Sequence, residues 1–130
     1  MRAKALIPLF VMATAILAVA CDAGFGVTGI VHEWPDPPIG AEGEIYVNEG
    51  EPVAGAVKGV VGASLSFGRY GKAVTDYTGA FKGFWVVGPG QYYVALTVEK
   101  EGYFTVSKRF RYDSRSPNYT FEVVMVRKQP

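Results

Sequence analysis

Apolar and polar residues alternate with a period of two along much of the chain. Between Tyr92 and Val98 the apolar side chains occupy every second position, and Tyr93, Ala95 and Thr97 fall between them. Such alternation is typical of β-strands that bury one face. No run after Cys21 keeps a helical period over three turns, so the pattern predicts an all-β fold. Three further runs alternate in the same way, with inward positions at Ala63, Leu65 and Phe67; at Phe104, Val106, Phe110 and Tyr112; and at Tyr119, Phe121, Val123 and Met125.

Other segments complete the expected set of strands. Residues 25–32 and 45–47 are predicted as strands, and residues 81–87, apolar on both faces, predict a central strand covered on both sides. Residues 34–40 contain three prolines, which remove amide donors and predict a stiff loop. Residues 53–62 fit either a strand or a packed loop. About seven short strands at this spacing predict a single β-sandwich.

Two turn motifs separate strands in the middle of the chain. Asp76 can accept hydrogen bonds from backbone amides two residues on, and Gly79 can adopt the positive φ that closes such a turn. Pro89 and Gly90 suit the second and third positions of the next turn. These four residues are predicted to be structural, so Asp76→Ala should lower stability and leave ligand binding intact.

The first 20 residues have the character of an export signal. An apolar run from Ala5 to Ala20 follows a short basic head, and it is too short to span a bilayer comfortably. It ends at Cys21, the single cysteine of the chain. The sequence Leu17-Ala18-Val19-Ala20-Cys21 resembles the lipobox of bacterial lipoproteins, although that family prefers a branched residue where Ala18 stands. Without that resemblance, three alternatives remain for this cysteine: a buried free thiol, an intermolecular disulfide and an uncleaved anchor helix.

The lipobox resemblance implies cleavage before Cys21 and lipidation of that residue. The exported chain would then be anchored to a bacterial membrane, on its periplasmic or cell-surface side, through acyl chains such as palmitate. Each buried methylene of such a chain contributes about 0.8 kcal/mol to membrane binding. The membrane is therefore one expected partner.

Five short motifs follow one another along the chain: Gly29-x-Val31, Gly62-Ala63-x-Leu65, Thr75-Asp76-x-x-Gly79-x-Phe81, Pro89-Gly90-x-Tyr92-x-Val94 and Gly102-Tyr103. In this order they resemble the carboxypeptidase regulatory-like domain, a transthyretin-like or prealbumin-like Greek-key β-sandwich. The resemblance implies a sandwich at 26–127 with an acidic insertion at about 35–61, after the lipoprotein signal peptide at 1–20 and a short tether at 21–25. The family serves as accessory or adhesive modules on exported proteins and implies no catalytic residue.

Charge is unevenly distributed, although 13 basic residues nearly balance 12 acidic ones. Residues 22–51 carry acids and no Lys or Arg, whereas residues 52–130 are basic overall. Solvated faces that partly neutralise one another would account for this, and so would a polarised surface for a charged partner. The small total predicts no nucleic-acid partner.

Catalytic and metal-binding patterns are sparse. His32 is the single histidine, it has no nucleophile at motif spacing, and it is interpreted as a surface residue at a strand end. One His and one Cys do not make a zinc site. The acids at Glu42, Glu44, Glu49 and Glu51 lack the regularity of a calcium loop. We therefore expect a protein that is not an enzyme and has no cofactor and no metal.

A non-enzymatic binding module is the expected function. One hypothesis is an interaction with an envelope protein through a sheet edge or through the face that carries Arg109 and Arg111. The alternative is carbohydrate binding, with a glycan held by exposed aromatic rings. The candidate binding residues are Trp34, Trp85, Tyr93, Arg109 and Arg111.

Overall fold

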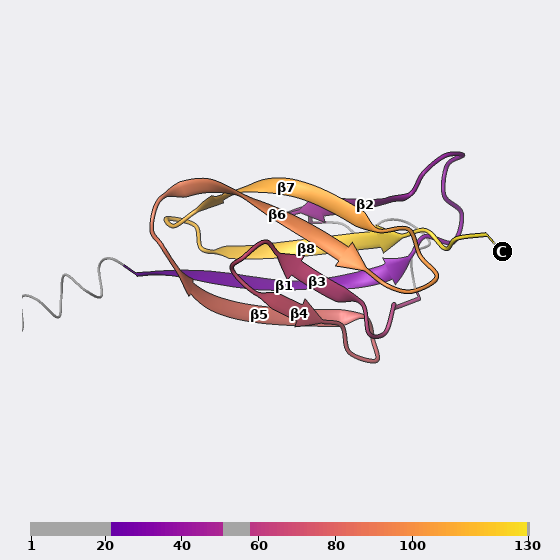
Figure 1. Cartoon of the computed structure of the whole chain (residues 1–130), viewed down its shortest axis with the longest axis horizontal. Coiled ribbons are helices and arrows are strands. Elements are labelled where there is room, and N and C mark those ends of the chain that lie inside the picture. Colours follow the sequence, from indigo (N-terminus) through magenta and orange to yellow (C-terminus); the bar gives the residue numbers. More distant parts are fainter. Residues whose placement is uncertain (1–21, 51–57, 130) are drawn as a thin grey trace, which may run out of the picture.

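Two four-stranded β-sheets pack face to face in the computed structural model, which describes residues 22–50 and 58–129 (Figure 1). The predicted all-β sandwich is confirmed, with eight strands in the described part of the chain rather than about seven. Sheet A has the order β2 (Gly43–Val47), β8 (Asn118–Met125), β1 (Ala23–Glu33) and β5 (Ala80–Val87). Sheet B has the order β4 (Lys72–Val74), β3 (Ser64–Phe67), β6 (Gln91–Glu99) and β7 (Val106–Asp113).

The strand β1 lies inside sheet A and sets the orientation of its neighbours. It pairs with β8 in parallel, from Gly26 opposite Asn118 to Glu33 opposite Met125. It pairs with β5 in antiparallel register, starting with Ala23 opposite Val87. The start of β1, the β5–β6 turn and the β7–β8 turn therefore share one end of the sandwich, here called the N-terminal end (Figure 1).

The core consists of the inward positions that the alternation predicts, with aromatic rings at its centre. The ring of Phe25 meets five other rings at centroid distances of 5.1–6.1 Å. Such pairs contribute about 0.5–1.5 kcal/mol each beyond the burial of their area. The predicted inward residues Leu65, Leu96 and Val123 are all fully buried. Local alternation therefore identified the core-facing side of these strands.

The prediction of a central strand at residues 81–87 is wrong. Among the described strands, β5 lies at the edge of sheet A and pairs only with β1. Its outward side chains Phe84 and Val86 are each 66% exposed, whereas Phe81 and Val87 are buried. The apolar residues on both faces thus reflect an exposed apolar surface and not a second covering layer.

The predicted insertion at 35–61 supplies a strand. Its strand candidate 45–47 is confirmed and extends to Gly43–Val47, which pairs with β8 as the opposite edge of sheet A. Between this edge of sheet A and the β7 edge of sheet B, Lys108 Nζ donates to the carbonyl oxygen of Ile45 at 2.8 Å. The same atom lies 3.6 Å from Glu44 Oε1. An acidic segment and a basic strand therefore neutralise one another here. Residues 51–57 of the insertion lie outside the described residues.

The beginning of the chain is described only from Asp22 onward. The predicted signal peptide and Cys21 lie outside the described residues. The predicted tether at 21–25 is wrong for its last three residues, because β1 begins at Ala23. Within residues 22–50 and 58–129, no helix has the length and apolar character to cross a membrane.

Candidate functional site

The turn at Asp76 is built by hydrogen bonds to one carboxylate oxygen. Asp76 Oδ1 accepts from the backbone amide of Thr78 at 2.8 Å, from the Thr78 hydroxyl at 2.6 Å and from the amide of Ala80 at 3.2 Å. The Thr78 hydroxyl, foremost among these contacts, lowers the pKa of Asp76. Gly79 has a φ of 86°, and a Cβ there would lie 2.4 Å from the carbonyl oxygen of Val31. These contacts agree with the structural role that the sequence predicts.

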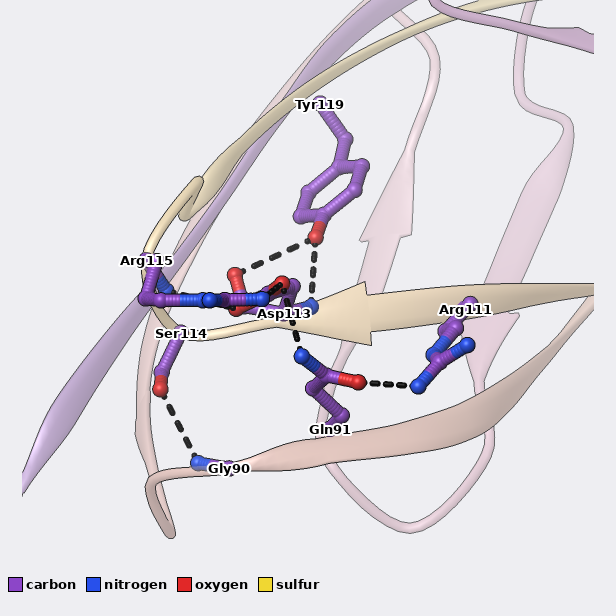
Figure 2. Close-up of polar contacts among 7 residues, drawn as sticks. All are labelled: Gly90, Gln91, Arg111, Asp113, Ser114, Arg115 and Tyr119. Carbon is purple, nitrogen blue, oxygen red and sulfur yellow. Dashed lines mark hydrogen bonds and ion pairs between the residues drawn. The ribbon is translucent and has the colours of Figure 1, made fainter.

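The second predicted turn is tied to the neighbouring β7–β8 turn. Gly90 has a φ of 120°, and its amide donates to the hydroxyl of Ser114 at 2.9 Å (Figure 2). The hydroxyl of Tyr92 donates to the carbonyl oxygen of Gly88 at 2.8 Å. The turn at Pro89 and Gly90 is therefore joined to the N-terminal end of the sandwich.

Three of the predicted binding residues meet on the outer face of sheet B. Tyr93 of β6 lies opposite Arg111 of β7, and Ala95 lies opposite Arg109. The guanidinium carbon of Arg109 lies 4.7 Å from the centroid of the Tyr93 ring. At an exposed site such a cation–π contact contributes about 0.5–1 kcal/mol. The hairpin thus assembles an aromatic and cationic group, here called the Tyr93–Arg face.

Figure 2 shows how polar contacts order the end of this face. Arg111 donates to Gln91 Oε1, and Gln91 Nε2 donates to Asp113 Oδ2 at 3.2 Å. Arg115 holds the same carboxylate at 2.8 Å. Its side-chain hydrogen bonds are the main reason that the pKa of Asp113 falls to about 2. Since Arg115 neutralises Asp113, and no described carboxylate lies within ion-pair distance of Arg109 or Arg111, this face is positive.

Trp85 does not face solvent as the binding hypothesis expects. Its ring points into the sandwich and lies 5.6 Å from the ring of Phe25 and 5.3 Å from that of Phe67. A Cβ on Gly71 would lie 2.0 Å from Trp85 Cε2, so the indole fills the space at the β4–β5 side of the sandwich. The outward placement of Trp85 is therefore corrected to a packing position.

Trp34 lies apart from the other candidates. It is half-buried directly after β1, and its amide donates to the carbonyl oxygen of Met125 at 2.9 Å. The parallel register of β1 and β8 places Trp34 at one end of the sandwich, whereas Tyr93 and Arg111 lie near the other, N-terminal end. The five candidates therefore form one group of three residues and two separate tryptophans.

An exposed apolar surface on β5 was not among the predicted sites. Phe84 and Val86 share the outer face of sheet A, and Ile30 of β1 adds a partly exposed side chain. The alternation of residues 80–87 contained this signal. It was missed because the sequence alone does not show which strands lie at a sheet edge.

Two polar clusters occur at the opposite end of the molecule. His32 is 3% exposed, and its Nε2 lies 2.7 Å from Glu122 Oε2, so its interpretation as a surface residue is wrong. Tyr103 donates its hydroxyl to Glu33 Oε1 at 2.7 Å, and Arg127 donates to the same oxygen at 2.8 Å. Both clusters join segments that lie far apart in the sequence. In the described ranges no group of three His, Cys, Asp or Glu side chains is arranged to hold a metal ion.

Comparison of the chain with known protein families, with curated proteins and with solved structures finds no match. The resemblance to the carboxypeptidase regulatory-like domain therefore rests on the sequence motifs. The candidate surfaces of the molecule are the Tyr93–Arg face and the apolar surface of β5.

Proposed function

We propose that this protein is a non-enzymatic, lipid-anchored envelope lipoprotein whose carboxypeptidase regulatory-like sandwich binds a partner protein. One observation carries the proposal: β5 is an eight-residue edge strand with two large apolar side chains exposed on it. Exposed strand edges pair readily with a further strand, and β-strand addition is a common mode of peptide recognition. The expected occupant is an extended segment of an envelope protein, added to sheet A beside β5.

The other described edges are less suited to strand addition. The strand β4 has three residues. The edges of β2 and β7 lie together, and Lys108 of β7 donates a hydrogen bond to the carbonyl oxygen of Ile45 on β2. The strand β5 lies near the short strand β4, but no side chain of β4 forms a hydrogen bond with β5 among the described residues. It carries one charged side chain, Lys82, and native proteins usually protect an edge with more charge or with proline. This difference among the edges supports β5 as the docking strand.

Site-specific photo-crosslinking tests the docking strand. A photoreactive residue at Val86 should crosslink one envelope protein in intact cells, because this side chain projects beside the free edge. The matched control places the same residue at Glu101, which is exposed in the connection between β6 and β7, outside both candidate surfaces. Equal crosslinking from both positions would contradict the proposal, and a crosslink between two copies of this chain would identify a second copy as the occupant.

The lipid anchor is tested separately. Cys21→Ser should abolish the incorporation of labelled palmitate and release the protein from the membrane fraction. Unchanged acylation and unchanged membrane association of this variant would refute the anchor. The result does not depend on the identity of the partner.

Carbohydrate binding is the second candidate function. Trp34 and Trp85 do not form a shared ring platform for a sugar. Trp85 packs in the core, and Trp34 lies at the end of the sandwich where β8 finishes. The observation that favours it is a groove on the outer face of sheet A, beside Phe84.

A further inference from the structure

A groove with polar and aromatic walls crosses three strands of sheet A. It lies over Gly26 of β1, between Phe84 of β5 and Asn118 of β8, with Thr28 and Lys82 among its other lining residues. Its volume is about 590 Å³. Pockets for small ligands commonly measure about 300–1,000 Å³. The groove therefore has room for one or two sugar rings.

Glycines in β1 let two side chains of the groove approach the backbone closely. A Cβ on Gly26 would lie 2.6 Å from Asn118 Oδ1 and 3.7 Å from Phe84 Cδ2. A Cβ on Gly24 would lie 3.0 Å from the edge of the Phe84 ring. Since these two positions carry no side chain, the Asn118 amide lies close over Gly26 and the edge of the Phe84 ring lies close over Gly24, and both line the groove.

The polar side chains of the groove retain their hydrogen-bonding capacity. Thr28, Lys82 and Asn118 make no side-chain hydrogen bond or ion pair with another described residue. An amide can both donate and accept, a hydroxyl can do the same, and an ammonium can only donate. Lys82 is the one charged side chain in the lining.

We propose that this groove binds a saccharide that bears a carboxylate, such as a uronic acid residue. The apolar face of the sugar ring packs on Phe84, whose side chain is largely exposed. The sugar hydroxyls exchange hydrogen bonds with the Asn118 amide and the Thr28 hydroxyl, and the carboxylate pairs with Lys82. A purely apolar ligand would leave these polar groups without partners, which disfavours its binding.

This inference does not rest on strand addition at β5. Asn118 lies on β8, on the side of β1 opposite the free edge of β5. Failure of saccharide binding leaves the Val86 crosslink as expected, and failure of the crosslink leaves saccharide binding as expected. The two proposals therefore fail separately.

Calorimetric titration of the folded protein provides the test, with cellobiouronic acid as the acidic probe and cellobiose as its neutral counterpart. We expect the acidic probe to bind about threefold or more tightly than the neutral one, because a solvent-exposed ion pair adds a modest free energy. Absence of binding by the acidic probe at about 10 mM overturns the proposal. Equal binding of both probes overturns the assignment of a carboxylate.

Three variants locate the binding. Asn118→Ala should weaken both probes, and Lys82→Met should remove the preference for the acidic probe. Lys72→Met is the matched control, because Lys72 is an exposed lysine on sheet B and should leave binding unchanged. Circular dichroism confirms that each variant is folded. Loss of the acid preference in Lys72→Met, or unchanged binding in Asn118→Ala, overturns the site.

Discussion

At the residue scale, single side chains join segments that are distant in sequence or close a turn. Asp76 organises one turn through three hydrogen bonds to the same oxygen. Thr75, buried next to it, accepts from the amide of Ala63 at 2.8 Å and donates to the carbonyl oxygen of Val60 at 2.6 Å. This short segment therefore ties β4 to the chain before β3 and to the start of β5.

Replacement of Asp76 tests the structural role of the turn. Asp76→Ala should lower the melting temperature, because the amides of Thr78 and Ala80 lose their acceptor. Asp76→Asn, which keeps one carbonyl oxygen, should lower it less. Thermal unfolding followed by circular dichroism measures both, and crosslinking at Val86 should persist in the folded fraction. An unchanged melting temperature together with a lost crosslink would instead give Asp76 a binding role.

Tyr103 makes the stability of the protein depend on pH. Its hydrogen bond is the largest cause that lowers the pKa of Glu33 below 4.5, and Arg127 contributes further. The stabilisation is complete above the unfolded value of 4.5 and is lost as the pH falls through the lower, folded-state pKa. Tyr103→Phe should therefore cost about 1.5 kcal/mol at neutral pH and progressively less in acid.

Urea unfolding across the acid range measures this difference. Tyr77→Phe is the control, because Tyr77 is largely exposed and forms no hydrogen bond with a carboxylate among the described residues. It should follow the wild type at every pH. A constant difference between wild type and Tyr103→Phe would contradict the predicted link with Glu33.

At the element scale, β5 combines an exposed edge with a packed inner face. Its outward side chains remain in solvent, whereas Trp85 reaches inward across the sandwich toward β4. Gly71 and Gly83 allow this, since a Cβ on Gly83 would lie 2.7 Å from the indole. Close packing against the Trp85 ring therefore requires glycine at both positions.

Gly71→Ala tests that packing. The added methyl group meets Trp85, and overpacking of this kind costs about 1–3 kcal/mol of unfolding free energy. Gly88→Ala is the control, because a Cβ there meets nothing within 4 Å. In a double-mutant cycle, Gly71→Ala should cost less when Trp85 is replaced by Leu. Equal costs in the two backgrounds would remove Trp85 as the reason.

At the scale of the whole molecule, the start of β1 orients the sandwich relative to any anchor. Asp22 is the one residue between Cys21 and the first residue of β1. A lipid on Cys21 would hold the N-terminal end, with the β5–β6 and β7–β8 turns, against the bilayer (Figure 1). The opposite end, with the loop around Ile39, would point away from it.

Fluorescence quenching measures this orientation. A fluorophore on a cysteine introduced at Ser116, in the β7–β8 turn, should be quenched by bilayer-embedded quenchers in phosphatidylcholine vesicles. The same label at Ile39 should be quenched little. The quenching at Ser116 should disappear when Cys21 is replaced by Ser. Equal quenching at the two positions would refute the orientation.

Ion pairs also connect the acidic and basic parts of the chain across the molecule. Glu33 pairs with Arg127, and Glu44 lies near Lys108. These contacts support mutual neutralisation of the two halves. The Tyr93–Arg face keeps its positive charge, so a polarised surface persists locally.

The sequence alone determined which side chains of most strands face the core, because the pleat of a strand is a local property with a period of two. It also determined the turns at Asp76 and Gly90, whose chemistry lies within a few residues, and the proximity of Tyr93 and Arg111 follows from one hairpin. Only the tertiary structure decided that β5 is an edge strand, that Trp85 turns inward, that His32 is buried, and that Gly26, Phe84 and Asn118 line one groove. Those outcomes depend on which strands pair across long separations in sequence, and alternation within a strand carries no information about its neighbours.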